Sequence, residues 1–151
     1  MSGINYARVL LGGLLAGLVI NISEFVLNGV ILMDDYTAAM ESYNLTEASW
    51  AMGGYIVSAF ILGFVVAWLY AAIRPRFGAG WKTGATAGVV LWLGAIVVPS
   101  IWFLAMGMSY GTGLTVLSLV WALVELVLAG MAGGWVYREG AAAAPAQQAA
   151  L

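Results

Sequence analysis

The sequence predicts an all-α integral membrane protein, a four-helix transmembrane bundle with a short interfacial outer loop. Of its 151 residues, 64% are hydrophobic and only 8% are charged, whereas soluble domains are usually about half apolar and about a quarter charged. So few charges cannot cover a water-facing surface. Apolar runs of roughly 20 residues, long enough to cross a bilayer as a helix, recur along the chain. They are too long for the strands of a membrane β-barrel.

The first two spans are expected at about 9–33 and 50–73. The first begins after Arg8, and its apolar run is too long for a signal peptide and is followed by no cleavage motif. We therefore interpret it as a retained span. The second is expected to end before Pro75, because proline lacks the amide proton that a helix needs.

The other two spans are expected at about 83–108 and 114–137. With them, residues 1–139 form a single four-span membrane domain. Residues 140–151 are rich in alanine and have no apolar stretch of membrane length, so they are predicted to form a flexible cytoplasmic tail.

The connection 34–49 is predicted to lie outside the membrane. Four residues recur in it at helical spacing: Tyr36, Ala39, Met40 and Tyr43. This pattern suits a short helix in the outer interface, and an ordinary acidic turn is the alternative. Asn44 and Glu47 are spaced to cap the start of the second span.

The basic residues predict the orientation. All five lie on one side of the predicted topology: Arg8, Arg74, Arg76, Lys82 and Arg138. The opposite loop carries only acidic charges: Asp34, Asp35, Glu41 and Glu47. Because basic residues remain in the cytoplasm, both termini are predicted to be cytoplasmic (N-in/C-in), in the inner membrane of a cell.

The second and fourth spans end on the same pattern, Gly-x4-Trp-x-Tyr. Its members are Gly63, Trp68 and Tyr70 in the second span, and Gly130, Trp135 and Tyr137 in the fourth. We interpret the Trp and Tyr residues as anchors in the headgroup region, where such rings are enriched. A duplicated helix hairpin, as in transporters with internal repeats, is the alternative.

Two acidic residues lie inside spans, Glu24 in the first and Glu125 in the fourth. A charge near mid-membrane costs about 2.5–3.5 kcal/mol on insertion scales, so these side chains are expected to face protein or water. Counted from Arg8 and Arg138 at about 1.5 Å per residue, the two acids lie at similar depth. We expect at least one of them to be protonated at neutral pH and to donate a hydrogen bond.

Three further polar residues lie in or near the same layer: Asn21, Asn28 and Ser58. With the two acids they form a candidate ligand or proton site. Two interpretations stay open. The cluster is either a proton or cation site of a small carrier, or a set of hydrogen bonds between helices worth about 0.6 kcal/mol each on average.

Small residues spaced four apart predict close helix contacts. These are Gly13 and Gly17 in the first span, Gly80, Gly84 and Gly88 in the third, and Gly130 and Gly134 in the fourth. Glycine lets two helix backbones approach closely in a membrane. Each helix is therefore expected to have a tight neighbour, within the bundle or across a subunit interface.

The absence of His and Cys from the sequence limits the chemistry. It excludes His-ligated haem, iron–sulfur clusters, zinc–thiolate sites and mechanisms with a histidine base. No metal site, nucleophile–base pair or nucleic-acid-binding pattern is recognised. No signature identifies a cofactor, and we expect the protein not to be an enzyme.

A resemblance to known proteins rests on three stretches: Gly12-Gly13 with Ala16-Gly17, Glu24-Phe25, and residues 68–75 at the exit of the second span. With these, the chain resembles small uncharacterised bacterial inner-membrane proteins with four spans, which implies the fold but no activity. In size and in its first-span acid it also resembles small multidrug carriers, although their Trp- and Tyr-lined motif is missing.

The sequence thus predicts a non-catalytic membrane protein that serves as a structural or accessory subunit, surrounded by lipid and packed against its own copies or other membrane subunits. The alternative is a small proton-coupled transporter that uses Glu24 and Glu125, with Asn21 and Asn28 as supporting ligands.

Overall fold

The computed structural model describes residues 3–138 and contains only helices and their connections over that range. Its elements are α1 (Tyr6–Val26), η1 (Leu27–Ile31), α2 (Met33–Ser42), α3 (Ala51–Phe77), α4 (Trp81–Trp92), η2 (Leu93–Val97), α5 (Val98–Ala105) and α6 (Thr112–Val136), where η denotes a π-helical turn. The predicted tail lies outside the described residues.

Four continuous helical segments are long and apolar enough to cross a membrane: Tyr6–Ile31, Ala51–Phe77, Trp81–Ala105 and Thr112–Val136. The prediction of an all-α chain with four such helices is confirmed. Their ends differ from the predicted ones by a few residues, as expected where the apolar pattern fades gradually.

Proline affects two of these helices differently. The expected end of the second span before Pro75 is wrong, because α3 continues to Phe77 and stops where Gly78 takes a φ of 84°. Pro75 lies in the last turn, so its missing amide proton removes little of the helix ladder. In the third span, Pro99 comes two residues after η2. The helix is wider in η2, where the Val98 amide donates its proton to the carbonyl of Leu93, five residues earlier. Such π turns are a common response to an interrupted helix ladder.

The connection between the first two spans forms a helix, α2, which decides between the two alternatives for that segment. The predicted cap by Asn44 and Glu47 is wrong. Asn44 has a positive φ of 53° just after α2, and α3 begins only after Trp50, without a side-chain cap. Glu47 instead accepts a hydrogen bond from the Tyr55 hydroxyl at 3.0 Å.

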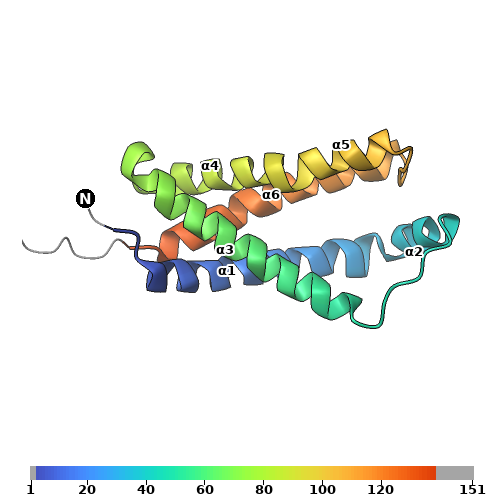
Figure 1. Ribbon diagram of the computed structural model, residues 1–151, viewed down its shortest axis with the longest axis horizontal. Helices are drawn as coiled ribbons and strands as arrows, with labels where there is room; N and C mark the ends of the chain where they lie inside the picture. Colours follow the sequence, from blue (N-terminus) through green and yellow to red (C-terminus); the bar gives the residue numbers. More distant parts are fainter. Residues whose placement is uncertain (1–2, 139–151) are drawn as a thin grey trace, which may run out of the picture.

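The helices pack as two pairs, α1 with α3 and α4 with α6, and α1 also crosses α6 (Figure 1). We call the end where Asn5, Gly80 and Tyr137 lie the basic end, and the end formed by α2 and the 106–111 turn the acidic end. Among the described residues, the largest side chains that are fully buried are Ile20, Val66 and Leu126, one from each of α1, α3 and α6. These three helices therefore meet around a common core.

Glycines lie where these helices touch. A Cβ added at Gly63 of α3 would meet the backbones of Gly13 and Gly17 in α1. One added at Gly84 of α4 would lie 2.7 Å from the carbonyl oxygen of Gly130 in α6. No side chain fits at these crossings, so the packing distance depends on glycine.

Three other glycines were also predicted to be packing residues, and two of them lie against a neighbouring helix in the structure. Gly88 faces the backbone of Leu126, and Gly134 faces the Tyr70 ring. Gly80 differs from its prediction as a packing residue, because no atom of residues 3–138 lies within 4 Å of its Cβ position. Its φ of 133° places it in the turn before α4, where glycine is needed for backbone conformation.

The repeated Gly-x4-Trp-x-Tyr ending separates into two kinds of aromatic residue. Tyr70 and Tyr137 are buried and meet edge to face, with ring centroids 5.8 Å apart. Their hydroxyls accept hydrogen bonds from the backbone amides of Gly80 and Asn5, each at 3.2 Å. The expectation that both tyrosines are headgroup anchors is therefore wrong, because their rings form the core of the basic end.

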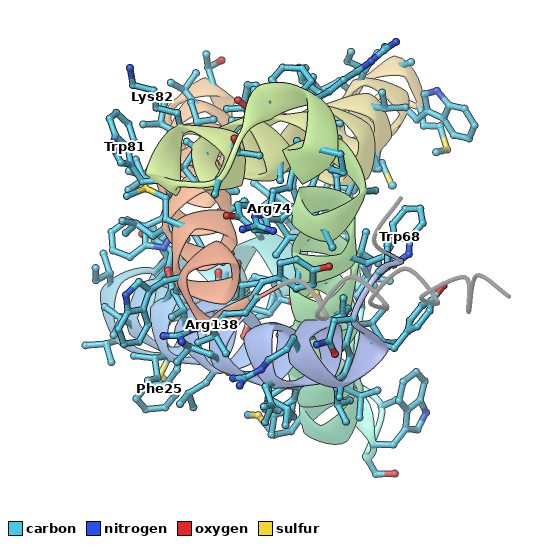
Figure 2. All side chains as sticks on the ribbon, turned by 90° about the vertical axis from the view of Figure 1, so that its left-hand side faces the viewer. Phe25, Trp68, Arg74, Trp81, Lys82 and Arg138 are labelled. Atoms are coloured by element: carbon cyan, nitrogen blue, oxygen red, sulfur yellow. The ribbon has the colours of Figure 1, made fainter. Side chains whose placement is uncertain are left out.

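The tryptophans of the same pattern point outward. Trp68 and Trp135 are 47% and 83% exposed, and Figure 2 shows Trp68 directed away from the helices at this end of the bundle. In the same view Arg74 lies inward, between the helices. Its guanidinium stands 5.7 Å from the centre of the Tyr137 ring, a cation–π arrangement.

Candidate functional site: a carboxyl pair between two helices

The structure brings the two acids inside the spans together at the contact of α1 with α6. The carboxyl groups of Glu24 and Glu125 are in hydrogen-bonding contact with each other. Glu125 is only 4% exposed, and Glu24 is partly buried. Two carboxyl groups can share a hydrogen bond only when one of them carries a proton.

Three more side chains complete this polar cluster. The Asn28 amide donates to Oε2 of Glu24, four residues away along the chain. Ser23 is in hydrogen-bonding contact with Glu125, and the indole Nε1 of Trp121 donates to the Ser23 hydroxyl at 2.8 Å. Asn28 therefore bonds to the carboxyl pair directly, and Trp121 of α6 is linked to it through Ser23.

Helix geometry explains why these residues share one interface. Glu24 and Asn28 are four residues apart on the first span, as are Trp121 and Glu125 on α6. Residues at this spacing lie on the same helix face, one turn apart. Ser23 precedes Glu24 and lies toward α6, where the Trp121 ring reaches it.

Asn21 and Ser58, which the sequence placed in this layer, do not join the cluster. Asn21 faces α3, and its amide donates to the carbonyls of Gly17 at 2.8 Å and Ile56 at 3.4 Å. Ser58 is exposed, and its hydroxyl donates to the Tyr55 carbonyl of its own helix. The predictions for Asn21 and Ser58 were based on depth along the span, and depth alone does not determine the direction in which a side chain points.

Sequence reasoning missed Ser23 and Trp121. A signal for Trp121 was present, because it lies well inside the fourth span, away from the boundaries where tryptophan usually anchors. It also lies one turn before Glu125. Ser23 had the weaker signal of being the hydroxyl residue next to Glu24.

One oxygen of the pair has no hydrogen bond. Oε2 of Glu125 is buried, and among residues 3–138 nothing is placed to donate to it. Buried polar atoms without partners are uncommon, and in native proteins they often mark a functional or strained position. Glu125 is thus the least satisfied polar group of the interface.

Two cavities, of about 440 and 400 Å³, lie at the ends of the bundle and not at this pair. Residues around the first include Glu47, Trp50 and Tyr55, and the second lies between Arg8 and Arg138. In the part of the chain that the structure describes, no three acidic side chains gather closely enough to hold a metal ion.

The arrangement can therefore hold a proton and link two helices by hydrogen bonds in a low-dielectric setting. In comparisons with known proteins, no family model, no curated protein and no solved structure matches this chain.

Proposed function

We propose that this protein is a non-catalytic membrane protein that serves as a structural or accessory subunit of a membrane assembly. The observation that carries this proposal is the sparse packing of the third span. Only 11% of its most apolar stretch is buried within the chain, against 33% for the first and second spans. Of the described helices, only η2, with which α5 is continuous, lies close to the backbone of α5.

Helix packing in membranes favours small residues and close backbone approach. No atom of the described part of the chain lies within 4 Å of the Cβ position of Gly94, in η2 just before α5, so a further helix can approach the backbone there. The same surface carries large apolar side chains, with Ile101 and Trp102 more than half exposed. These features support a face of η2 and α5 that is covered by a neighbouring subunit, either another copy of the chain or a different membrane protein.

A crosslinking experiment with matched positions tests this proposal. Val98 on α5 and Leu14 on α1 are 46% and 45% exposed, so a photoreactive residue at either position starts from the same accessibility. We expect protein–protein adducts in the native membrane from position 98 and lipid adducts from position 14. Lipid adducts at both positions, together with a monodisperse monomer in mild detergent, would contradict the proposal.

We further propose that both termini face the cytoplasm, in the inner membrane of a bacterial cell. The support is the charge distribution: Arg8 and Arg138 border the same cavity, and Arg74 in the last turn of α3 and Lys82 in the first turn of α4 lie at that end as well. Basic residues of short loops remain on the cytoplasmic side. The resemblance to small bacterial four-span proteins agrees with this placement.

The chain has no cysteine, so single cysteines can report its orientation. In intact cells, a membrane-impermeant maleimide is expected to label Ser42→Cys in α2. It should label Ala79→Cys, in the turn before α4, only after the membrane is opened. The reverse pattern would show that the orientation is wrong.

A second candidate, a small proton-coupled transporter, is favoured by the contact between Glu24 and Glu125. It predicts pH-dependent uptake into reconstituted vesicles that is lost in Glu24→Gln and Glu125→Gln. If both variants behave as the unmodified protein in every flux assay, this candidate is wrong.

A further inference from the structure

We propose that Glu24 and Glu125 form a binding site for one exchangeable proton, held between α1 and α6. This inference goes beyond the proposed subunit role and is independent of it, because the site would lie within a single chain. Its basis is the contact between the two carboxyl groups, which as two carboxylates would repel each other at this depth.

The hydrogen bonds around Glu24 and Glu125 indicate which of the two carboxyl groups carries the proton. Asn28 donates a hydrogen bond to Glu24, which stabilises a negative charge on that carboxylate. Glu125 has the Ser23 hydroxyl beside it, but its buried Oε2 has no partner among the described residues. A neutral acid tolerates an unpaired carbonyl oxygen far better than a carboxylate does. The proton therefore resides on Glu125 and is donated to Glu24.

No basic residue competes for this site. Glu24 is the charged group that acts on Glu125. The other titratable side chains on the helices packed against α1 and α6 lie toward the ends of those helices: Tyr55, Tyr70, Arg74, Arg76 and Lys82. The charge of the pair therefore depends on whether the two acids hold their shared proton, and not on a neighbouring basic side chain.

The geometry also offers an exchange route. Glu125 is enclosed, Glu24 is partly exposed and Asn28 is exposed. A proton leaving Glu125 passes to Glu24 and reaches the surface beside Asn28, toward the acidic end. Two carboxyl groups without a third acidic ligand suit a proton better than a divalent cation, which needs about six oxygen ligands.

A hydrophobic carbodiimide tests the site in the full-length protein, reconstituted in lipid nanodiscs. The reagent reacts with a protonated carboxyl group: the acid proton moves to a carbodiimide nitrogen, and the carboxyl oxygen bonds to the central carbon. The adduct then rearranges to a stable N-acylurea without losing an atom. We expect one label per chain at neutral pH, mapped by mass spectrometry to Glu24 or Glu125, and its loss as the pH is raised.

Absence of label on both acids, two labels on one chain, or labelling that does not change with pH would each overturn the proposal. These outcomes are read from the unmodified protein, so they do not depend on whether a variant folds. They are also separate from the crosslinks at position 98, which test the subunit role.

Thermal unfolding at a series of pH values gives a second measurement. Loss of the shared proton leaves two facing carboxylates, so the stability of the unmodified protein should fall as the pH rises. Glu125→Gln retains a neutral hydrogen-bond donor and should remove that part of the pH dependence. Glu47→Gln, at an exposed acid outside the pair, should keep it. A Glu125→Gln variant with the unmodified pH profile would also overturn the proposal.

Discussion

The basic half of the bundle, from its middle to the basic end, is held by glycine–backbone contacts and by buried tyrosine rings, whereas the acidic half is linked through side-chain hydrogen bonds. At the middle of the bundle Gly63 rests against the backbone of α1, and toward the basic end Gly84 rests against that of α6. Toward the acidic end, the ribbons of α1 and α6, which lie together at the basic end, separate (Figure 1). The links there are hydrogen bonds, such as the carboxyl pair and the contact of Tyr43 with Ser109.

This difference has a mechanical consequence. A backbone contact at glycine cannot adjust to an added atom, because the neighbouring atoms belong to a helix rather than to a flexible side chain. A hydrogen bond near the surface can be lost to water at small cost. The basic half should therefore be intolerant of substitution and the acidic half adaptable, which suits an end that changes protonation or receives a neighbour.

Gly63→Ala should have the largest effect. Its methyl group would overlap the backbones of Gly13 and Gly17, so α1 and α3 must separate. Overpacking of this kind typically costs about 1–3 kcal/mol. Unfolding in mixed detergent micelles measures the loss. Gly53→Ala in the same helix is the matched control, because no described residue comes within 4 Å of the methyl group there. Equal stabilities of the two variants would contradict the contrast between the halves.

The sequence predicted the helices well because the signals for them are local. Apolar length, flanking charges and four-residue spacing marked the spans and most of the packing glycines. The direction in which a polar side chain points was harder to predict. Asn21 and Ser23 are two residues apart, yet Asn21 donates to the Ile56 carbonyl of α3 and Ser23 contacts Trp121 of α6. Which neighbour lies on which side follows from the packing of the whole bundle, and no local pattern encodes it.

The aromatic residues show the same limit. Trp135 and Tyr137 both suit a headgroup belt by type and position, but one is 83% exposed and the other 4%. Gly80 continued a four-residue spacing of glycines, although the helix starts only after it. A residue type and its spacing thus predict what a side chain can do, and the fold determines which of these roles it takes.

Tyr70→Phe should have an intermediate effect on the basic half. It removes the hydroxyl that accepts from the Gly80 amide at 3.2 Å and leaves the buried ring in place. The net loss of one such hydrogen bond is about 0.5–1.5 kcal/mol, again measured by unfolding. Trp68→Phe, at an exposed ring on the same helix, should stay within about 0.5 kcal/mol of the unmodified protein. A larger loss in the tryptophan variant would show that the buried tyrosines are not what stabilises this end.

Tyr43→Phe should have the smallest effect on global stability and a local effect at the acidic end. The Tyr43 hydroxyl donates to the Ser109 carbonyl at 2.8 Å and accepts from the Ser109 amide at 2.6 Å, which ties the end of α2 to the 106–111 turn. Both partners are near the surface, so water can replace them, and we expect a loss below about 1 kcal/mol. Hydrogen exchange of the Ser109 amide should accelerate, while amides around Gly63 keep their protection, because local opening need not involve the core. If exchange accelerates equally at both places, the two halves unfold as one unit and the acidic half has no independent mobility.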